Sequence, residues 1–182
     1  ISKQLEVFRA KHQEQENQLA ALIDIARDND AAFNRMHELT LSMLEARCLE
    51  DVVANLAEVL HDCFLTDFVA IKIIQERADS PISNLYVAPE DAGLKYFADE
   101  LKTNKARCGR PTFPQACFLF GDAAPEVKSA AIIPMVFTQM EGLLAIGSRD
   151  ETRFHFSMGS MFLTQMSEVV GTRLIALMQQ ME

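Results

Sequence analysis

Residues 129–137 read Ser-Ala-Ala-Ile-Ile-Pro-Met-Val-Phe, and residues 142–150 read Gly-Leu-Leu-Ala-Ile-Gly-Ser-Arg-Asp. A short polar turn centred on residues 138–141 joins these two apolar stretches. The pair therefore predicts a β-hairpin. Neither strand is polar enough to present a face to water, so we expect other elements to cover the sheet.

The segments around this hairpin alternate between helical and extended patterns. Helical spacing is found over residues 49–64, 89–102 and 162–177, and Phe154-His155-Phe156-Ser157 leads into the last of these helices. Extended patterns are found over residues 67–74 and 84–87, with a turn at Ser80-Pro81 between them. Residues 106–114 are predicted to be irregular, and residues 115–120 to form a short helix ended by Gly121. This order predicts an α+β fold with an antiparallel sheet and helices mainly on one side.

Residues 1–47 contain no Pro or Gly and are rich in helix-forming residues. A heptad seam of thirteen positions, nine of them apolar, runs from Ile1 to Met43. We therefore expect a coiled-coil-type dimerisation helix over residues 1–47, followed by a globular domain over residues 48–182. The alternative is a helical hairpin that breaks near Asp28-Asn29-Asp30. The residues expected to form the dimer seam are Leu5, Phe8, Leu19, Leu22, Phe33 and Met36.

Composition and charge bear on the class of partner. The net charge of -9 disfavours binding to nucleic acid, because a phosphate polymer repels an acidic surface. No apolar run approaches the ~20 residues that cross a bilayer, and no signal segment is found, so we expect a cytoplasmic protein without a membrane partner. We also expect no cofactor and no bound metal, because the sequence contains no metal-binding or phosphate-binding motif.

The four cysteines form no CxxC pair, and the histidines do not interleave with them at zinc-finger spacing. Free thiols are therefore expected. Cys63 and Cys117 are predicted to act as small buried hydrophobes. Cys108 is predicted to be the most reactive thiol, because it lies between Arg107 and Arg110 in a segment expected to be a loop.

The order of elements in the C-terminal half resembles that of a GAF domain, a small-molecule-sensing relative of the PAS domain. Four stretches resemble, more specifically, an uncharacterised bacterial GAF-like family catalogued as domain of unknown function 484. The resemblance implies a bacterial cytoplasmic protein with a GAF-like fold that pairs through helices, and it supplies no binding residue. The stretches are residues 14–33, Arg107-Cys108-Gly109-Arg110, Leu119-Phe120-Gly121-Asp122 and residues 142–156.

Catalysis by this chain is not favoured. GAF relatives that reduce free methionine sulfoxide place a reactive cysteine where this chain has Gly121, so the nucleophile is missing. The motifs of cyclic-nucleotide-binding and bilin-binding GAF domains are also missing from the sequence. A redox pair of Cys108 and Cys117 remains the catalytic alternative.

A basic cluster is the single local positive excess in this acidic chain, at Lys95, Lys102, Lys105, Arg107 and Arg110. Arginine grips a carboxylate or phosphate through two parallel hydrogen bonds, so Arg107 and Arg110 are predicted to contact an anionic or polar ligand. Tyr86 and Ser129 are predicted to be neutral hydrogen-bonding partners. The competing interpretation of the cluster is a solvated surface partly neutralised by Asp99 and Glu100.

Three hypotheses about function follow. The first is a non-enzymatic signalling domain, GAF-like and homodimeric, that binds a small polar or anionic ligand. The second is a ligand-free scaffold for pairing proteins, in which aromatic side chains fill the pocket. The third is a thiol-based redox sensor or reductase. The residues expected to fill the pocket of the scaffold are Phe97, Phe113, Phe118 and Phe120.

Overall fold

A computed structural model describes residues 2–76, 82–155 and 160–180 of the chain. The chain divides into two units, Ile1–His37 and Glu38–Glu182. Helix α1 (Ser2–Glu45) is continuous, so the predicted alternative of a hairpin broken near Asp28 is wrong. Its last turns belong to the second unit, where Leu39 and Met43 are buried. The turn predicted at Ser80-Pro81 and the residues Phe156-Ser157 lie outside the described residues.

The second unit contains a five-stranded sheet in the order β2-β1-β5-β4-β3. The predicted hairpin is confirmed as β4 (Ser129–Val136) and β5 (Glu141–Ser148), which pair antiparallel. Strand β1 (Phe68–Ile74) pairs antiparallel with β5. Strand β3 (Arg107–Gly109) pairs antiparallel with β4, so the expectation of an irregular segment is wrong at these residues. The sheet is mixed rather than purely antiparallel, because β2 (Tyr86–Val87) pairs parallel with β1.

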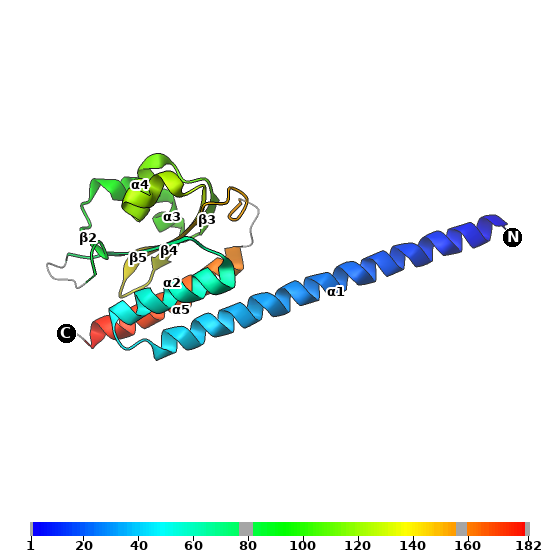
Figure 1. Cartoon of the computed structure of the whole chain (residues 1–182), viewed down its shortest axis with the longest axis horizontal. Coiled ribbons are helices and arrows are strands. Elements are labelled where there is room, and N and C mark those ends of the chain that lie inside the picture. Colours follow the sequence, from blue (N-terminus) through cyan, green and yellow to red (C-terminus); the bar gives the residue numbers. More distant parts are fainter. Residues whose placement is uncertain (1, 77–81, 156–159, 181–182) are drawn as a thin grey trace. The chain divides into compact units, whose positions relative to one another are not determined.

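Helices cover both faces of the sheet, which corrects the expectation that they lie mainly on one side (Figure 1). Helices α2 (Leu49–Phe64) and α5 (Ser160–Gln179) lie on one face. The 3-10 helix η1 (Ala92–Phe97) and helices α3 (Ala98–Thr103) and α4 (Phe113–Phe120) lie on the other, and the 3-10 helix η2 (Gly121–Glu126) continues from α4. Both faces of β4 and β5 are therefore dry, as their apolar runs require.

Alternation along the strands separates the two halves of the core, because successive side chains point to opposite faces. Leu143 and Ala145 of β5 pack with Phe97 and Leu119 on the α4 face. The intervening Leu144 and Ile146, also buried, therefore point to the face covered by α2 and α5. In β1, the same alternation assigns Ala70 and Lys72 to the α4 face.

Two arginines join helix ends to distant parts of this unit. Nε of Arg153 donates to the backbone oxygen of Phe64, at the end of α2, over 2.8 Å. Nε of Arg173, on α5, donates to the oxygen of Ala46 in the turn after α1, over 3.1 Å. Both contacts satisfy backbone carbonyls next to helix ends, where the helix leaves its last carbonyls without partners.

Candidate functional site

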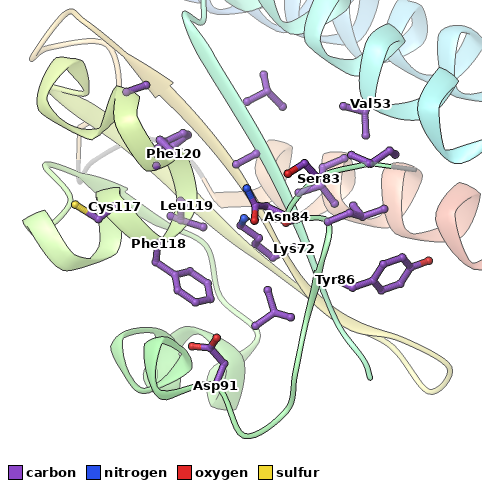
Figure 2. A pocket seen from close by; sticks show the side chains of 18 of the residues that line it. Val53, Lys72, Ser83, Asn84, Tyr86, Asp91, Cys117, Phe118, Leu119 and Phe120 are labelled. Carbon is purple, nitrogen blue, oxygen red and sulfur yellow. Dashed lines mark hydrogen bonds between the residues drawn. The ribbon is translucent and has the colours of Figure 1, made fainter. Parts of the chain in front are cut away.

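A cavity of about 810 Å³ lies along β1, next to the short strand β2 (Figure 2). Its walls come from β1, from residues 82–88, from Asp91 and from the end of α4 with the following turn. Val53 of α2 also lines it. Below, this space is called the β1–α4 cavity. Its volume falls within the range of about 300–1,000 Å³ that is typical of small-molecule sites.

Lys72 is the buried cation of the β1–α4 cavity, with 7% of its surface exposed. Its Nζ donates to the backbone oxygen of Asn84 over 2.8 Å and lies 5.9 Å from the centroid of the Phe118 ring. An ammonium has three donor hydrogens. In the described part of the chain, the Asn84 oxygen is the single acceptor bonded to this group. Lys72 therefore keeps donor capacity for a molecule in the cavity.

Burial lowers the pKa of Lys72, because a charged ammonium loses hydration in the cavity wall. The Asp91 carboxylate opposes this effect through its charge and raises the pKa of Lys72. Lys72 and Asp91 thus interact electrostatically although, within the described residues, no ion pair joins them. Figure 2 shows both side chains on the same side of β1, with Phe118 beside them.

Asp91 is positioned by the start of η1. It is the N-cap of that helix, and its Oδ1 accepts a hydrogen bond from the backbone nitrogen of Gly93 over 2.7 Å. The second carboxylate oxygen has no hydrogen-bond donor among the described residues. Asp91 is exposed and lines the β1–α4 cavity. The cap therefore holds an anionic group at the rim of the cavity.

Phe118 forms an aromatic wall beside Lys72, and its place depends on a glycine. A Cβ atom added to Gly93 would lie 2.3 Å from Cδ2 of Phe118, so only glycine allows the ring to pack this closely on η1. The Phe118 ring also packs against Phe97, with 5.3 Å between centroids. Phe97 is fully buried, Phe118 and Phe120 line the cavity, and Phe113 is exposed.

A capping box fixes α4, which carries Phe118. The Thr112 side chain accepts a hydrogen bond from the backbone nitrogen of Gln115, and the Gln115 side chain accepts one from the backbone nitrogen of Thr112. Gln115 Nε2 also donates to the backbone oxygen of Tyr96 over 2.9 Å. This buried amide ties α4 to η1, so the two cavity walls that present Phe118 and Asp91 are joined directly.

The structure separates the four predicted ligand contacts. Tyr86 lines the β1–α4 cavity. Arg107 and Arg110 instead line a depression of about 10 Å³ beside β3, and Arg107 pairs with the buried Glu100 over 3.3 Å. Ser129, the first residue of β4, is fully buried outside the cavity. Its Oγ donates to the backbone oxygen of Asp150 over 2.6 Å and accepts from the backbone nitrogen of Phe154.

Sequence reasoning missed Lys72 and Asp91. The signal for Lys72 was present in Phe-Val-Ala-Ile-Lys-Ile-Ile, where one charged residue interrupts an apolar strand that is expected to be covered on both faces. Such a residue must reach a cavity or a partner, because an unpaired buried charge is strongly disfavoured. No comparable signal marked Asp91, since acidic residues before a helix are usually simple caps.

The environments of the thiols differ from two expectations. Cys108 lies on strand β3 rather than in a loop, and burial raises the pKa of its thiol. The expected loop position is therefore wrong, and the pKa of the thiol is raised although the flanking arginines were expected to favour the thiolate; the reactivity itself stays a prediction. Cys117 is exposed rather than buried, because α4 turns this position away from the core. None of the four cysteines forms a disulfide, and Cys63, predicted to be buried, is partly buried.

The described residues offer neither a metal site nor a membrane-spanning helix. No group of three or more His, Cys, Asp or Glu side chains could hold a metal ion in residues 2–76, 82–155 and 160–180. Over the same ranges, no helix combines the length and apolar character needed to cross a membrane.

Comparison with known proteins defines the class and then the family of this chain. It is similar to the GAF domain of a two-component sensor histidine kinase from Bacillus halodurans, with a TM-score of 0.50, 16% identity, and coverage of 75% of this chain and 100% of that chain. It is also similar to the native GAF domain of the potassium sensor histidine kinase KdpD from Escherichia coli, with a TM-score of 0.49, 14% identity, and coverage of 81% and 95%. The fold is thus GAF-like.

The family model described as protein of unknown function, DUF484, matches residues 1–177, and the chain belongs to this family. Both the predicted family and the predicted GAF-like fold are therefore confirmed. No match was found among curated proteins.

Proposed function

We propose that this chain is a non-enzymatic, GAF-like regulatory domain that binds a small polar or anionic ligand in the β1–α4 cavity. The observation that carries the proposal is a buried lysine with spare donor capacity in a cavity of about 810 Å³. A buried cation is costly unless something pairs with it. The similar GAF domains belong to sensor histidine kinases, and a regulatory role for this chain agrees with their names.

The ligand-free scaffold has less support. That hypothesis needs the aromatic side chains to occupy the pocket. Phe118 and Phe120 line the β1–α4 cavity instead, and Phe113 has 66% of its surface exposed. Room for a ligand remains between these rings and β1.

The redox hypothesis also has less support. Attack on a disulfide or a sulfoxide requires a thiolate. Burial raises the pKa of Cys108, which disfavours the thiolate form at neutral pH. Cys117, the other member of the suggested pair, is exposed on α4.

We also propose that α1 pairs two copies of the chain. The seam residues Leu5, Phe8, Leu19, Leu22 and Phe33 have 53–74% of their surface exposed, and Met36 is partly buried. Burying each large side chain would contribute roughly 1.5–3 kcal/mol. The described interactions over residues 2–37 include pairs three or four residues apart, such as Asp24 with Arg27, which stabilise a lone helix only weakly. A partner helix would cover the seam.

A thermal-shift screen of nucleotides, amino acids and organic acids tests the ligand site. Binding to the native state alone stabilises a protein by about 2.7 kcal/mol at a hundredfold excess over Kd, which a melting curve detects. A hit that is lost in Lys72→Met and kept in Lys102→Met, an exposed lysine on α3 outside the cavity, supports the proposal. A hit that is indifferent to Lys72→Met but lost in Arg107→Ala would move the site to β3.

A further inference from the structure

The β1–α4 cavity presents both signs of charge to one space. Lys72 supplies a buried cation from β1. Asp91 and Asp122 supply carboxylates from the start of η1 and from η2. Lys72 and Asp91 line the same cavity, and the Asp91 charge raises the pKa of Lys72. Within the described residues, no ion pair joins the two groups.

A ligand with a single charge meets one favourable group and at least one unfavourable group in this cavity. A simple carboxylate would bind Lys72 but would be repelled by Asp91 and Asp122. A simple amine would bind Asp91 but would be repelled by Lys72. Like charges brought together in a partly desolvated site are costly, since the low local dielectric strengthens the repulsion.

A zwitterion satisfies both groups. Its carboxylate can accept hydrogen bonds from the Lys72 ammonium hydrogens that do not bond to Asn84. Its ammonium can donate a hydrogen bond to the Asp91 carboxylate oxygen that does not accept from Gly93. The Phe118 ring lies beside Lys72 and offers a surface for an apolar part of the same molecule. The charges, the free hydrogen-bonding capacity and the aromatic wall are thus complementary to one class of molecule.

We propose that the β1–α4 cavity selects a small zwitterion that carries both a carboxylate and an ammonium, with Lys72 binding the carboxylate and Asp91 binding the ammonium. This inference rests on the proposed function, because it names the chemical class of ligand for the same cavity.

The test compares three related probes by calorimetry on the full chain: phenylalanine, its analogue without the amine, 3-phenylpropanoate, and its analogue without the carboxylate, 2-phenylethylamine. A second set, 6-aminohexanoate, hexanoate and hexylamine, has the two charges further apart. In at least one set the zwitterion is expected to bind at least tenfold more tightly than both the acid and the amine. This comparison uses the unaltered protein and does not depend on how any variant folds.

Two variants then assign the roles. Lys72→Met should weaken the zwitterion and the acid at least tenfold while leaving the amine equal or tighter. Asp91→Asn should weaken the zwitterion and the amine at least tenfold while the acid binds more tightly. Asparagine keeps an oxygen that can cap Gly93, so this variant removes charge and preserves the start of η1. The matched controls Lys102→Met and Asp99→Asn, both exposed on α3 and outside the cavity, should change nothing.

The outcomes separate two kinds of failure. If an acid binds as tightly as its zwitterion and Asp91→Asn leaves that ratio unchanged, the zwitterion inference is wrong while the proposed ligand site stands. If none of the six probes binds and the broad screen also gives no hit, both the ligand site and this inference are overturned. A reversal of selectivity in opposite directions in the two variants would establish the inference.

Discussion

A charged side chain inside an apolar strand must be balanced by its neighbours. Lys72 is held by a backbone oxygen and an aromatic ring, and burial lowers the pKa of its ammonium. Methionine at this position would pack its stem equally well without the desolvation cost. We therefore interpret Lys72 as a binding residue that supplies a charge and hydrogen-bond donors to the cavity. Residues that serve binding often lower stability.

Asp67 is a second charged residue held by its neighbours, at the start of β1. Its Oδ2 accepts hydrogen bonds from the Arg149 nitrogen over 2.8 Å and from the Ser148 hydroxyl over 3.1 Å, and its Oδ1 accepts one from the Arg149 side chain. These bonds join the start of β1 to the end of β5. The bond from the Arg149 backbone, followed by the Ser148 hydroxyl and the Arg149 charge, lowers the pKa of Asp67.

Asp67→Asn is expected to reduce the free energy of unfolding by about 1–2 kcal/mol at pH 7, because hydrogen bonds to a charged group are lost or weakened. The native pKa of Asp67 lies below its ordinary value of 3.8. The stabilisation is therefore complete above pH 3.8 and is lost as the pH falls through the native pKa. Urea denaturation of both proteins at pH 7 and in strong acid measures this. A difference that grew in acid, or an equal loss in the exposed Glu90→Gln control, would contradict the assignment.

At the residue scale, the sequence revealed charges but did not decide between their possible partners. The basic cluster near β3 suggested ligand contacts or partial neutralisation by Asp99 and Glu100, and the side chain of Arg107 does pair with Glu100. The choice depends on how α3 and β3 meet, which no local pattern encodes. Tyr86, predicted as a neutral hydrogen-bonding partner, lines the cavity because β2 pairs with β1. Lys72 was missed although its isolation among apolar neighbours marked it.

At the scale of elements, the long apolar runs were predictable, and of the two short strands β2 was expected within residues 84–87 whereas β3 was not. Helix α2, strand β1 and the hairpin appear as expected, because periodicity and flanking turn residues agree in each of them. Strands β2 and β3 contain two and three residues, too few to show a period. Their pairing, and with it the mixed character of the sheet, is set by tertiary contacts.

The contact between β5 and β1 gives a prediction at this scale. A Cβ atom at Gly142 would lie 2.4 Å from the backbone oxygen of Lys72. Strand β5, which carries Gly142, is paired with β1 on one side and β4 on the other, so it cannot shift to relieve this clash. Gly142→Ala is therefore expected to lower the free energy of unfolding by about 1–3 kcal/mol, as overpacking does. Urea denaturation measures the loss.

Gly171→Ala on α5 is the matched comparison for Gly142→Ala. Its Cβ would lie 2.2 Å from the Phe137 ring, which is only partly buried and can rotate away. Alanine also favours a helix over glycine by about 1 kcal/mol. This variant should therefore be less destabilised than Gly142→Ala. An equal or greater loss in Gly171→Ala would show that the strand contact is not the limiting one.

At the scale of the whole molecule, the two units have different means of reaching stability. Residues 38–182 bury a core on both faces of a sheet, whereas residues 2–37 form part of a helix whose apolar seam is exposed. Isolated helices are marginal in water, and most helical stability in proteins comes from packing an apolar face. A second chain could supply that packing along a heptad seam, as in coiled coils.

Leu22→Glu is therefore expected to convert a dimer into a monomer. Leu22 lies in the middle of the seam with 63% of its surface exposed, and a dimer would place two glutamates against each other there. Sedimentation velocity at tens of micromolar should give a dimer for the unaltered chain and a monomer for the variant. Ala21→Glu, which adds the same charge at an exposed off-seam position, should stay dimeric. A monomeric unaltered chain would rule out pairing through α1, and equal dissociation by both variants would attribute the effect to charge rather than to the seam.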